Sequence, residues 1–126
     1  IINKIYSMKY MFSHFDYDRF PIIKVTFQST IKDKEDFQSF LQEWENLYDL
    51  NEEFEFIFDT KAIESVSLTY IPKLISHMMR IRKEKKPMLT KVVVQLNSEF
   101  VNTLLNMVFK VYKPFCEVVI DYQKNT

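Results

Sequence analysis

A strand gives way to a helix within residues 58–72, which read Phe58-Asp59-Thr60-Lys61-Ala62-Ile63-Glu64-Ser65-Val66-Ser67-Leu68-Thr69-Tyr70-Ile71-Pro72. The strand alternates phenylalanines with other residues and ends in Asp59. A short polar loop follows, and an amphipathic helix then opens with Ser67 or Thr69 as its cap and Pro72 in its first turn. This arrangement predicts free backbone donors at one sheet edge, where α/β proteins usually bind their ligands.

The same two kinds of pattern recur along the chain. Alternating or β-branched runs predict strands, the first within residues 5–15 and the others at residues 21–27, 54–59, 92–96 and 117–122. Apolar stripes at helical spacing predict helices within residues 33–48, 68–83 and 98–112. The stripe of the first helix is interpreted as core, and it consists of Phe37, Phe40, Leu41, Trp44, Leu47 and Tyr48.

The order β-β-α-β-α-β-α-β predicts an α/β fold with a mixed, mostly parallel sheet and an antiparallel strand at the N-terminal end. No linker, repeat or low-complexity stretch interrupts residues 1–126. A single domain is therefore expected.

The composition argues against several classes of protein. Lysine and arginine together number 17, as do aspartate and glutamate, so the chain lacks the basic excess typical of nucleic-acid binders. The absence of glycine excludes the glycine-rich phosphate-binding loops, and we expect no cofactor. No apolar run reaches the roughly 18 residues of a membrane span, and no secretory signal pattern opens the chain. An intracellular, cytoplasmic protein without membrane insertion is expected.

The residue usage also carries a signature of the source. Phenylalanine, isoleucine, lysine, asparagine and tyrosine are abundant, while alanine occurs only at Ala62. This bias is typical of an AT-rich genome. The sequence begins with Ile1 rather than methionine, which leaves open that it belongs to a longer protein.

Residues suited to catalysis or metal binding do not gather in the sequence. His14 and His77 lack partners at ligand spacing, so we expect surface or boundary histidines and no metal site. Cys116 is expected to be a buried, small apolar residue on the last strand. Phosphorylation of Asp59, as in response-regulator receivers, would need acidic residues near residues 27–30 to hold magnesium, and there are none. We therefore interpret Asp59 as an acceptor that fixes the structure of the following loop.

Charged residues form two runs of opposite sign. The basic run ends the second predicted helix, and its residues are Arg80, Arg82, Lys83, Lys85 and Lys86. The acidic run ends the first predicted helix, and its residues are Glu43, Glu45, Asp49, Glu52 and Glu53. The basic run is interpreted as a solvated face that matches the helix dipole, with docking of an acidic partner as the alternative. Opposite patches would also suit head-to-tail contacts between copies.

The element order and the central segment resemble the STAS domain, the family of bacterial anti-sigma-factor antagonists and of the cytosolic tails of sulfate transporters. Members have a strand that ends in aspartate, then spaced hydrophobic residues and an Asp-Ser-Ser-Gly sequence that opens a helix. Asp59 matches the strand-end aspartate, and the hydrophobic positions match Ile63, Val66 and Ile71. The Asp-Ser-Ser-Gly sequence falls on residues 67–70. The resemblance covers roughly residues 20–120 by element order and about fifteen residues by motif, and it implies a binding or scaffold module.

The chain departs from the family at the residue that matters most for regulation. In the antagonists the first serine of that loop is the phosphorylated switch, and here its position is Leu68, which has no hydroxyl. The helix-opening glycine is replaced by Tyr70. A phospho-regulated switch at Leu68 is thus excluded, although the hydroxyls of Ser67 and Thr69 flank the position.

Two functions follow as hypotheses. The favoured one is a non-enzymatic interaction or scaffold module that binds a protein partner, or copies of itself within an assembly. Its contact residues would be Ser65, Ser67, Leu68, Thr69 and Lys73, on the loop and on the exposed face of the following helix. The alternative is a small-ligand binder or a divergent enzyme with a pocket at the C-terminal strand ends, near Asp59, Gln95 and Asn97.

Overall fold

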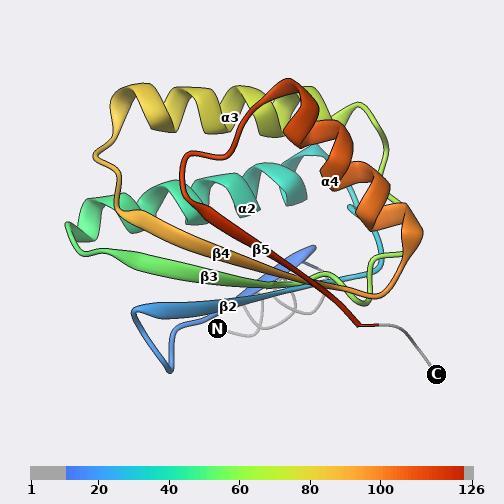
Figure 1. Ribbon diagram of the computed structural model, residues 1–126, viewed down its shortest axis with the longest axis horizontal. Helices are drawn as coiled ribbons and strands as arrows, with labels where there is room; N and C mark the ends of the chain where they lie inside the picture. The colour runs from blue at the N-terminus through green and yellow to red at the C-terminus, as the bar shows by residue number, and fades with distance from the viewer. Residues whose placement is uncertain (1–10, 124–126) are drawn as a thin grey trace.

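The computed structural model describes residues 11–123, in which five strands form one sheet and three α-helices cover one of its faces (Figure 1). The strands are β1 (Ser13–Asp16), β2 (Ile22–Phe27), β3 (Phe54–Asp59), β4 (Leu89–Leu96) and β5 (Glu117–Tyr122). The helices are α2 (Lys34–Asn46), α3 (Tyr70–Glu84), α4 (Glu99–Val111) and the short 3-10 helix η1 (Leu47–Leu50). The predicted α/β fold and element order are confirmed. The part of the first predicted strand at residues 5–10 lies outside the described residues.

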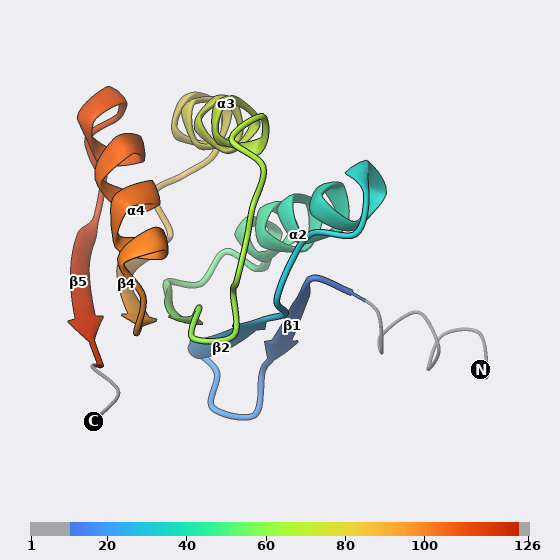
Figure 2. The same ribbon diagram turned by 90° about the vertical axis from the view of Figure 1, so that its right-hand side faces the viewer.

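The topology explains why the helices share one face. The strands follow the chain order β1-β2-β3-β4-β5 across the sheet, with β1 antiparallel to β2 and the remaining neighbours parallel. Each helix after β2 therefore leads the chain one strand further in the same direction. Because parallel crossovers are right-handed, the three helices fall on one face, with α3 between α2 and α4 (Figure 2). None of these helices, within the part of the chain that the structure describes, is long and apolar enough to cross a membrane.

Aromatic side chains fill the space between α2 and the sheet. The stripe predicted as core, from Phe37 to Tyr48, is buried along its whole length. The ring of Phe40 lies 6.1 Å from that of Phe15 in β1, 5.2 Å from that of Phe27 in β2 and 6.2 Å from that of Phe58 in β3. One helix residue thus joins three strands, and the interpretation of the stripe as core is confirmed.

Side chains alternate between the helix-covered face and the other face of the sheet. In β3, Phe54 and Phe56 are fully buried under the helices, whereas Glu55 between them is half-buried on the other face. The register pairs Glu55 with Lys91 of β4, and Lys91 with Glu117 of β5. A row of alternating charge therefore crosses the face that carries no helix within residues 11–123.

Side-chain caps begin two of the helices. Asp33 Oδ1 accepts a hydrogen bond of 2.8 Å from the backbone N–H of Asp36 at the start of α2. Ser98 Oγ accepts one of 3.2 Å from the backbone N–H of Val101 at the start of α4. Each bond satisfies a donor that has no partner within its own helix.

Replacing Ser98 with alanine should lower the free energy of unfolding by about 1 kcal/mol, because the Val101 N–H loses its acceptor. Thr103→Ala removes an exposed hydroxyl from the middle of the same helix and should leave the stability unchanged or slightly raised. Urea denaturation followed by circular dichroism measures both variants. Equal losses in the two variants would contradict the capping role of Ser98.

Candidate functional site

The loop of residues 60–69 joins β3 to α3 and is held by hydrogen bonds at its start and in its middle. The N–H and Oγ1 of Thr60 donate to the carbonyl oxygen of Gln95 in β4, at 2.9 Å and 2.8 Å. Further along, the N–H groups of Glu64 and Ser65 both donate to the carbonyl oxygen of Ser29, at 2.8 Å and 3.2 Å. The loop is therefore tied to two strand ends before the helix begins.

Asp59 lies at the C-terminal end of β3 and organises the start of this loop. Its Oδ1 accepts a hydrogen bond of 3.1 Å from the backbone N–H of Lys61. Its Oδ2 lies 3.9 Å from the Nζ of Lys24 and 4.0 Å from the Nζ of Lys61. The carboxylate is thus engaged by one backbone donor and two ammonium groups of its own chain.

The start of α3 differs from the predicted side-chain cap. Thr69 occupies the N-cap position, but its side chain makes no capping hydrogen bond. Instead Ser67 Oγ accepts from the N–H of Thr69 at 3.3 Å and lies 2.9 Å from the Oγ1 of Thr69. The carbonyl oxygens of Ser67 and Leu68 accept from the N–H groups of Tyr70 and Ile71, at 3.1 Å and 3.2 Å. These bonds form a tight turn that fixes the backbone of Leu68.

The five predicted contact residues are all exposed, on this turn and on the first turn of the helix. They are Ser65, Ser67, Leu68, Thr69 and Lys73. The side chain of Leu68 is 56% exposed although its backbone is held in place. Met79, 55% exposed, follows eleven residues later, which is about three helical turns or roughly 16 Å along the axis. We call the surface from Ser65 to Met79 the α3 outer face.

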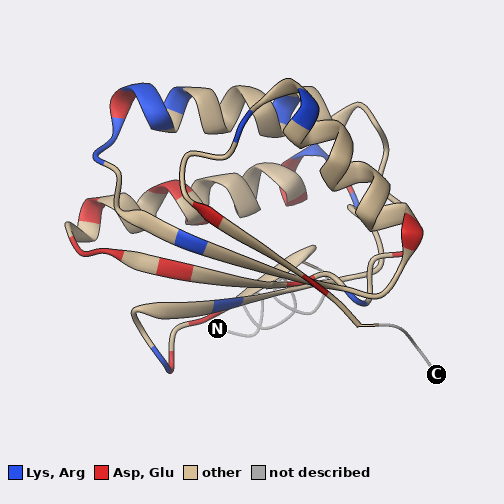
Figure 3. Cartoon of the chain, viewed as in Figure 1, with Lys and Arg blue, Asp and Glu red and all other residues tan. Residues whose placement is uncertain are grey.

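The charged runs meet within the molecule instead of forming two separate patches. Arg80 of α3 donates from both terminal nitrogens of its guanidinium, Nη1 and Nη2, to the carboxylate of Glu45 of α2, and Lys85 Nζ lies 3.6 Å from Asp49 Oδ1 of η1. Figure 3 shows the basic end of α3 directly above the acidic end of α2. Two of the five residues in each run therefore join α3 to α2 and η1, which leaves less charge for head-to-tail contacts between copies.

His77 is buried, and the sequence-based expectation of a surface or boundary histidine is wrong. Only 5% of the residue is exposed, and its ring packs edge-on against Trp44 at 4.8 Å between centroids. Its Nε2 has no hydrogen-bond partner among residues 11–123. Burial lowers its pKa to about 4, and the positive charge of Arg80 adds to that effect while Glu45 opposes it. His77 is thus held neutral between α2 and α3.

The remaining candidates for a metal site or a reactive cysteine are not supported by the structure. Within the described residues no three histidine, cysteine, aspartate or glutamate side chains gather as a metal site would require. Cys116 is half-buried and lies just before β5 rather than on it. Burial raises the pKa of its thiol, so the reactive thiolate is disfavoured.

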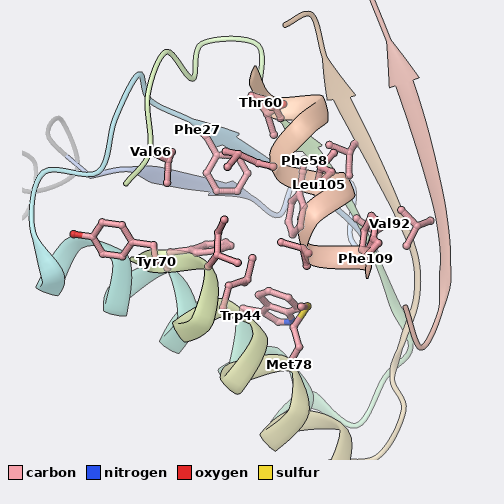
Figure 4. A pocket seen from close by; sticks show the side chains of 18 of the residues that line it. Phe27, Trp44, Phe58, Thr60, Val66, Tyr70, Met78, Val92, Leu105 and Phe109 are labelled. Atoms are coloured by element: carbon pink, nitrogen blue, oxygen red, sulfur yellow. The ribbon is translucent and has the colours of Figure 1, made fainter. Parts of the chain in front are cut away.

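A cavity of about 200 Å³ lies between the helices and the sheet, and the sequence did not reveal it. Figure 4 shows Phe58 and Val92 of the sheet facing Trp44 of α2 and Met78 of α3 across this space. Apolar residues of the helices and of the sheet line it. Their spacing in the sequence predicts that they are core residues, but it does not show that a space remains between the helices and the sheet.

The cavity is not the pocket that the ligand-binding alternative predicts. Asp59, Gln95 and Asn97 do not line it, whereas Thr60, Ile63 and Val66 of the loop do. Gln95 Oε1 is buried without a hydrogen-bond partner among residues 11–123. The polar groups at the strand ends and the apolar cavity are therefore two separate features that share the 60–69 loop as a boundary.

Comparison of the chain with protein-family models, with curated proteins and with solved structures finds no match.

Proposed function

We propose that the protein is a non-enzymatic interaction module that binds a protein partner, or a further copy of itself within an assembly, through the α3 outer face. The observation that carries the proposal is Leu68, a large apolar side chain that is 56% exposed on a backbone fixed by hydrogen bonds. An apolar anchor that is already ordered loses little conformational entropy on binding. Hydroxyl groups and Lys73 around it would supply a polar rim.

The resemblance to STAS domains supports the same kind of function, because it implies a binding or scaffold module. Leu68 stands where the family keeps its switch serine, so recognition here would be constitutive rather than controlled by phosphorylation at that position. The enzyme alternative has less support, since the Asp59 carboxylate is already engaged by Lys24 and Lys61.

Replacing Leu68 with aspartate should weaken partner binding about thirtyfold or more, as loss of an interface anchor does. Leu50→Asp is the matched control, because Leu50 is 54% exposed on η1 and lies outside the α3 outer face. Immobilised wild type, Leu68→Asp and Leu50→Asp are exposed to extract of the cells that express the protein. Retained proteins are then quantified by mass spectrometry.

A protein retained by the wild type and by Leu50→Asp, but lost with Leu68→Asp, is the expected result. If the retained protein is the chain itself, sedimentation should show association in the wild type and a monomer in Leu68→Asp. Equal retention by all three would refute this surface. Circular dichroism and melting temperature must be the same in both variants, since both substitutions are at exposed positions.

A further inference from the structure

The lining of the cavity is mostly apolar, and two of its polar hydrogens are already engaged in hydrogen bonds within the protein. The hydroxyl of Thr60 donates to the carbonyl oxygen of Gln95, and the Nε1 of Trp44 donates to the hydroxyl of Tyr48 at 3.3 Å. The remaining lining is mostly aliphatic and phenyl side chains from the sheet, α3 and α4 (Figure 4). Any group buried here must therefore be apolar.

The volume sets the size of that group. An engineered cavity of about 150 Å³ lined by leucine, isoleucine and phenylalanine binds benzene, which has six carbons. In proportion, the 200 Å³ of this cavity accommodates about eight carbons. Pro114 of the lining is exposed, and Tyr112 and Phe115 are half-buried, so this end of the cavity borders solvent.

Arg82 of α3 does not itself line the cavity, but it lies against two aromatic rings that do. The guanidinium carbon of Arg82 lies 5.7 Å from the ring centroid of Tyr112 and 5.9 Å from that of Phe115, and its Nη1 donates to the Tyr112 hydroxyl at 3.4 Å. Both rings line the cavity. Arg80 pairs with Glu45, but among residues 11–123 no carboxylate lies within ion-pair distance of Arg82. Stacking on two rings orients the guanidinium without neutralising it.

We propose that the cavity binds a medium-chain carboxylate of about eight carbons, with its chain inside and its carboxylate paired with Arg82. A single planar guanidinium matches the two oxygens of a carboxylate, and one fixed positive charge balances one negative charge. The apolar chain fills space that the side chains leave open, while the charged end stays at the solvent border. This inference concerns the inner side of the loop and does not depend on the partner proposed for the α3 outer face.

Trp44 provides the test, because it is the only tryptophan of the chain and lines the cavity. Titration with 8-bromooctanoate should quench Trp44 fluorescence with saturation, since bromine quenches only on contact, and octanoate should reverse the quenching. Arg82→Gln should weaken this binding about tenfold, as loss of a charge-assisted hydrogen bond does. Lys83→Gln removes the same charge from the adjacent exposed position and should leave it unchanged.

Filling variants test the location of the chain. Val92→Phe from the sheet and Leu105→Phe from α4 each place a larger side chain into the cavity, so both should abolish quenching while the melting temperature stays equal or rises. The absence of saturable quenching in the wild type would overturn the proposal. So would undiminished quenching in both filling variants, or equal weakening by Arg82→Gln and Lys83→Gln. Binding of 8-bromo-1-octanol as tight as that of the carboxylate would show that Arg82 is not the partner and overturn the assignment of the ligand class.

Discussion

Replacing Phe40 with alanine lowers the free energy of unfolding by about 4 kcal/mol, one of the two largest effects expected in this molecule. The side chain is 5% exposed, and its ring meets aromatic rings of β1, β2 and β3. Truncation removes the transfer free energy of the ring and enlarges the neighbouring cavity, which Phe40 also lines. Because a domain is stable by only about 5–15 kcal/mol, this variant should unfold at much lower urea concentrations.

Phe100→Ala makes the same chemical change at a position of α4 that is 38% exposed, and it should cost less than about 1 kcal/mol. Phe40→Leu keeps most of the volume and should cost roughly 1 to 2 kcal/mol, which keeps the comparison measurable if Phe40→Ala does not fold. Urea unfolding curves with a common slope give the three values. Similar losses in Phe40→Ala and Phe100→Ala would show that Phe40 does not join the strands.

Acid should destabilise the protein through His77 in a pH window set by its two pKa values. Burial holds the pKa of His77 at about 4 in the folded protein, against about 6.5 in the unfolded chain. Between these values the unfolded chain binds a proton that the folded protein does not, so stability is full above pH 6.5 and falls as the pH drops toward 4. The total loss is roughly 3 kcal/mol, of which about 2 kcal/mol is reached at pH 5.

His77→Leu should abolish this part of the pH dependence, since the apolar side chain cannot take up a proton and leaves no polar nitrogen buried. At pH 5 the variant should be more stable than the wild type, and at pH 7 at least as stable. His14→Gln removes the other histidine at an exposed position of β1 and should keep the wild-type pH dependence. Melting temperatures of the three proteins are measured from pH 4 to pH 8. If the melting temperatures of the wild type and of His77→Leu change with pH in the same way, His77 is not the buried neutral group that causes the loss of stability in acid.

Local signals in the sequence were enough for the element order. The spacing of the apolar residues from Phe37 to Tyr48 fits an amphipathic helix and not a strand. Asp33 and Ser98 each precede a helix, where a side-chain oxygen can accept hydrogen bonds from the first N–H groups. The β5 strand matches the prediction at both ends, Glu117 and Tyr122, because Pro114 precedes it and β-branched residues fill its centre at 118–120. Strand and helix periods differ so much that these segments could not be confused.

The burial of His77, the Arg80–Glu45 ion pair and the cavity could not be predicted from the sequence, because they depend on how helices and strands pack against one another. His77 lies beside the apolar stripe of α3, and only the position of Trp44 on α2 decides that it is buried. The charges of Arg80 and Glu45 lie 35 residues apart and meet because α2 and α3 are neighbours. The cavity arises because the apolar side chains of α3 and α4 face the sheet but do not fill the space between the helices and the sheet. The spacing of apolar residues in the sequence predicts which side chains face the core, but not how much volume they fill.

Photo-crosslinking from position 68 tests most directly whether the α3 outer face is a recognition surface. A photoreactive phenylalanine analogue is placed at position 68 and, in a second protein, at position 50, where the natural leucine is equally exposed. Irradiation in extract of the expressing cells, followed by mass spectrometry, identifies what lies against each position. Recognition through Leu68 predicts a single crosslinked protein, or a second copy of the chain, from position 68 and none of it from position 50. The same products from both positions, or none from position 68, would contradict it.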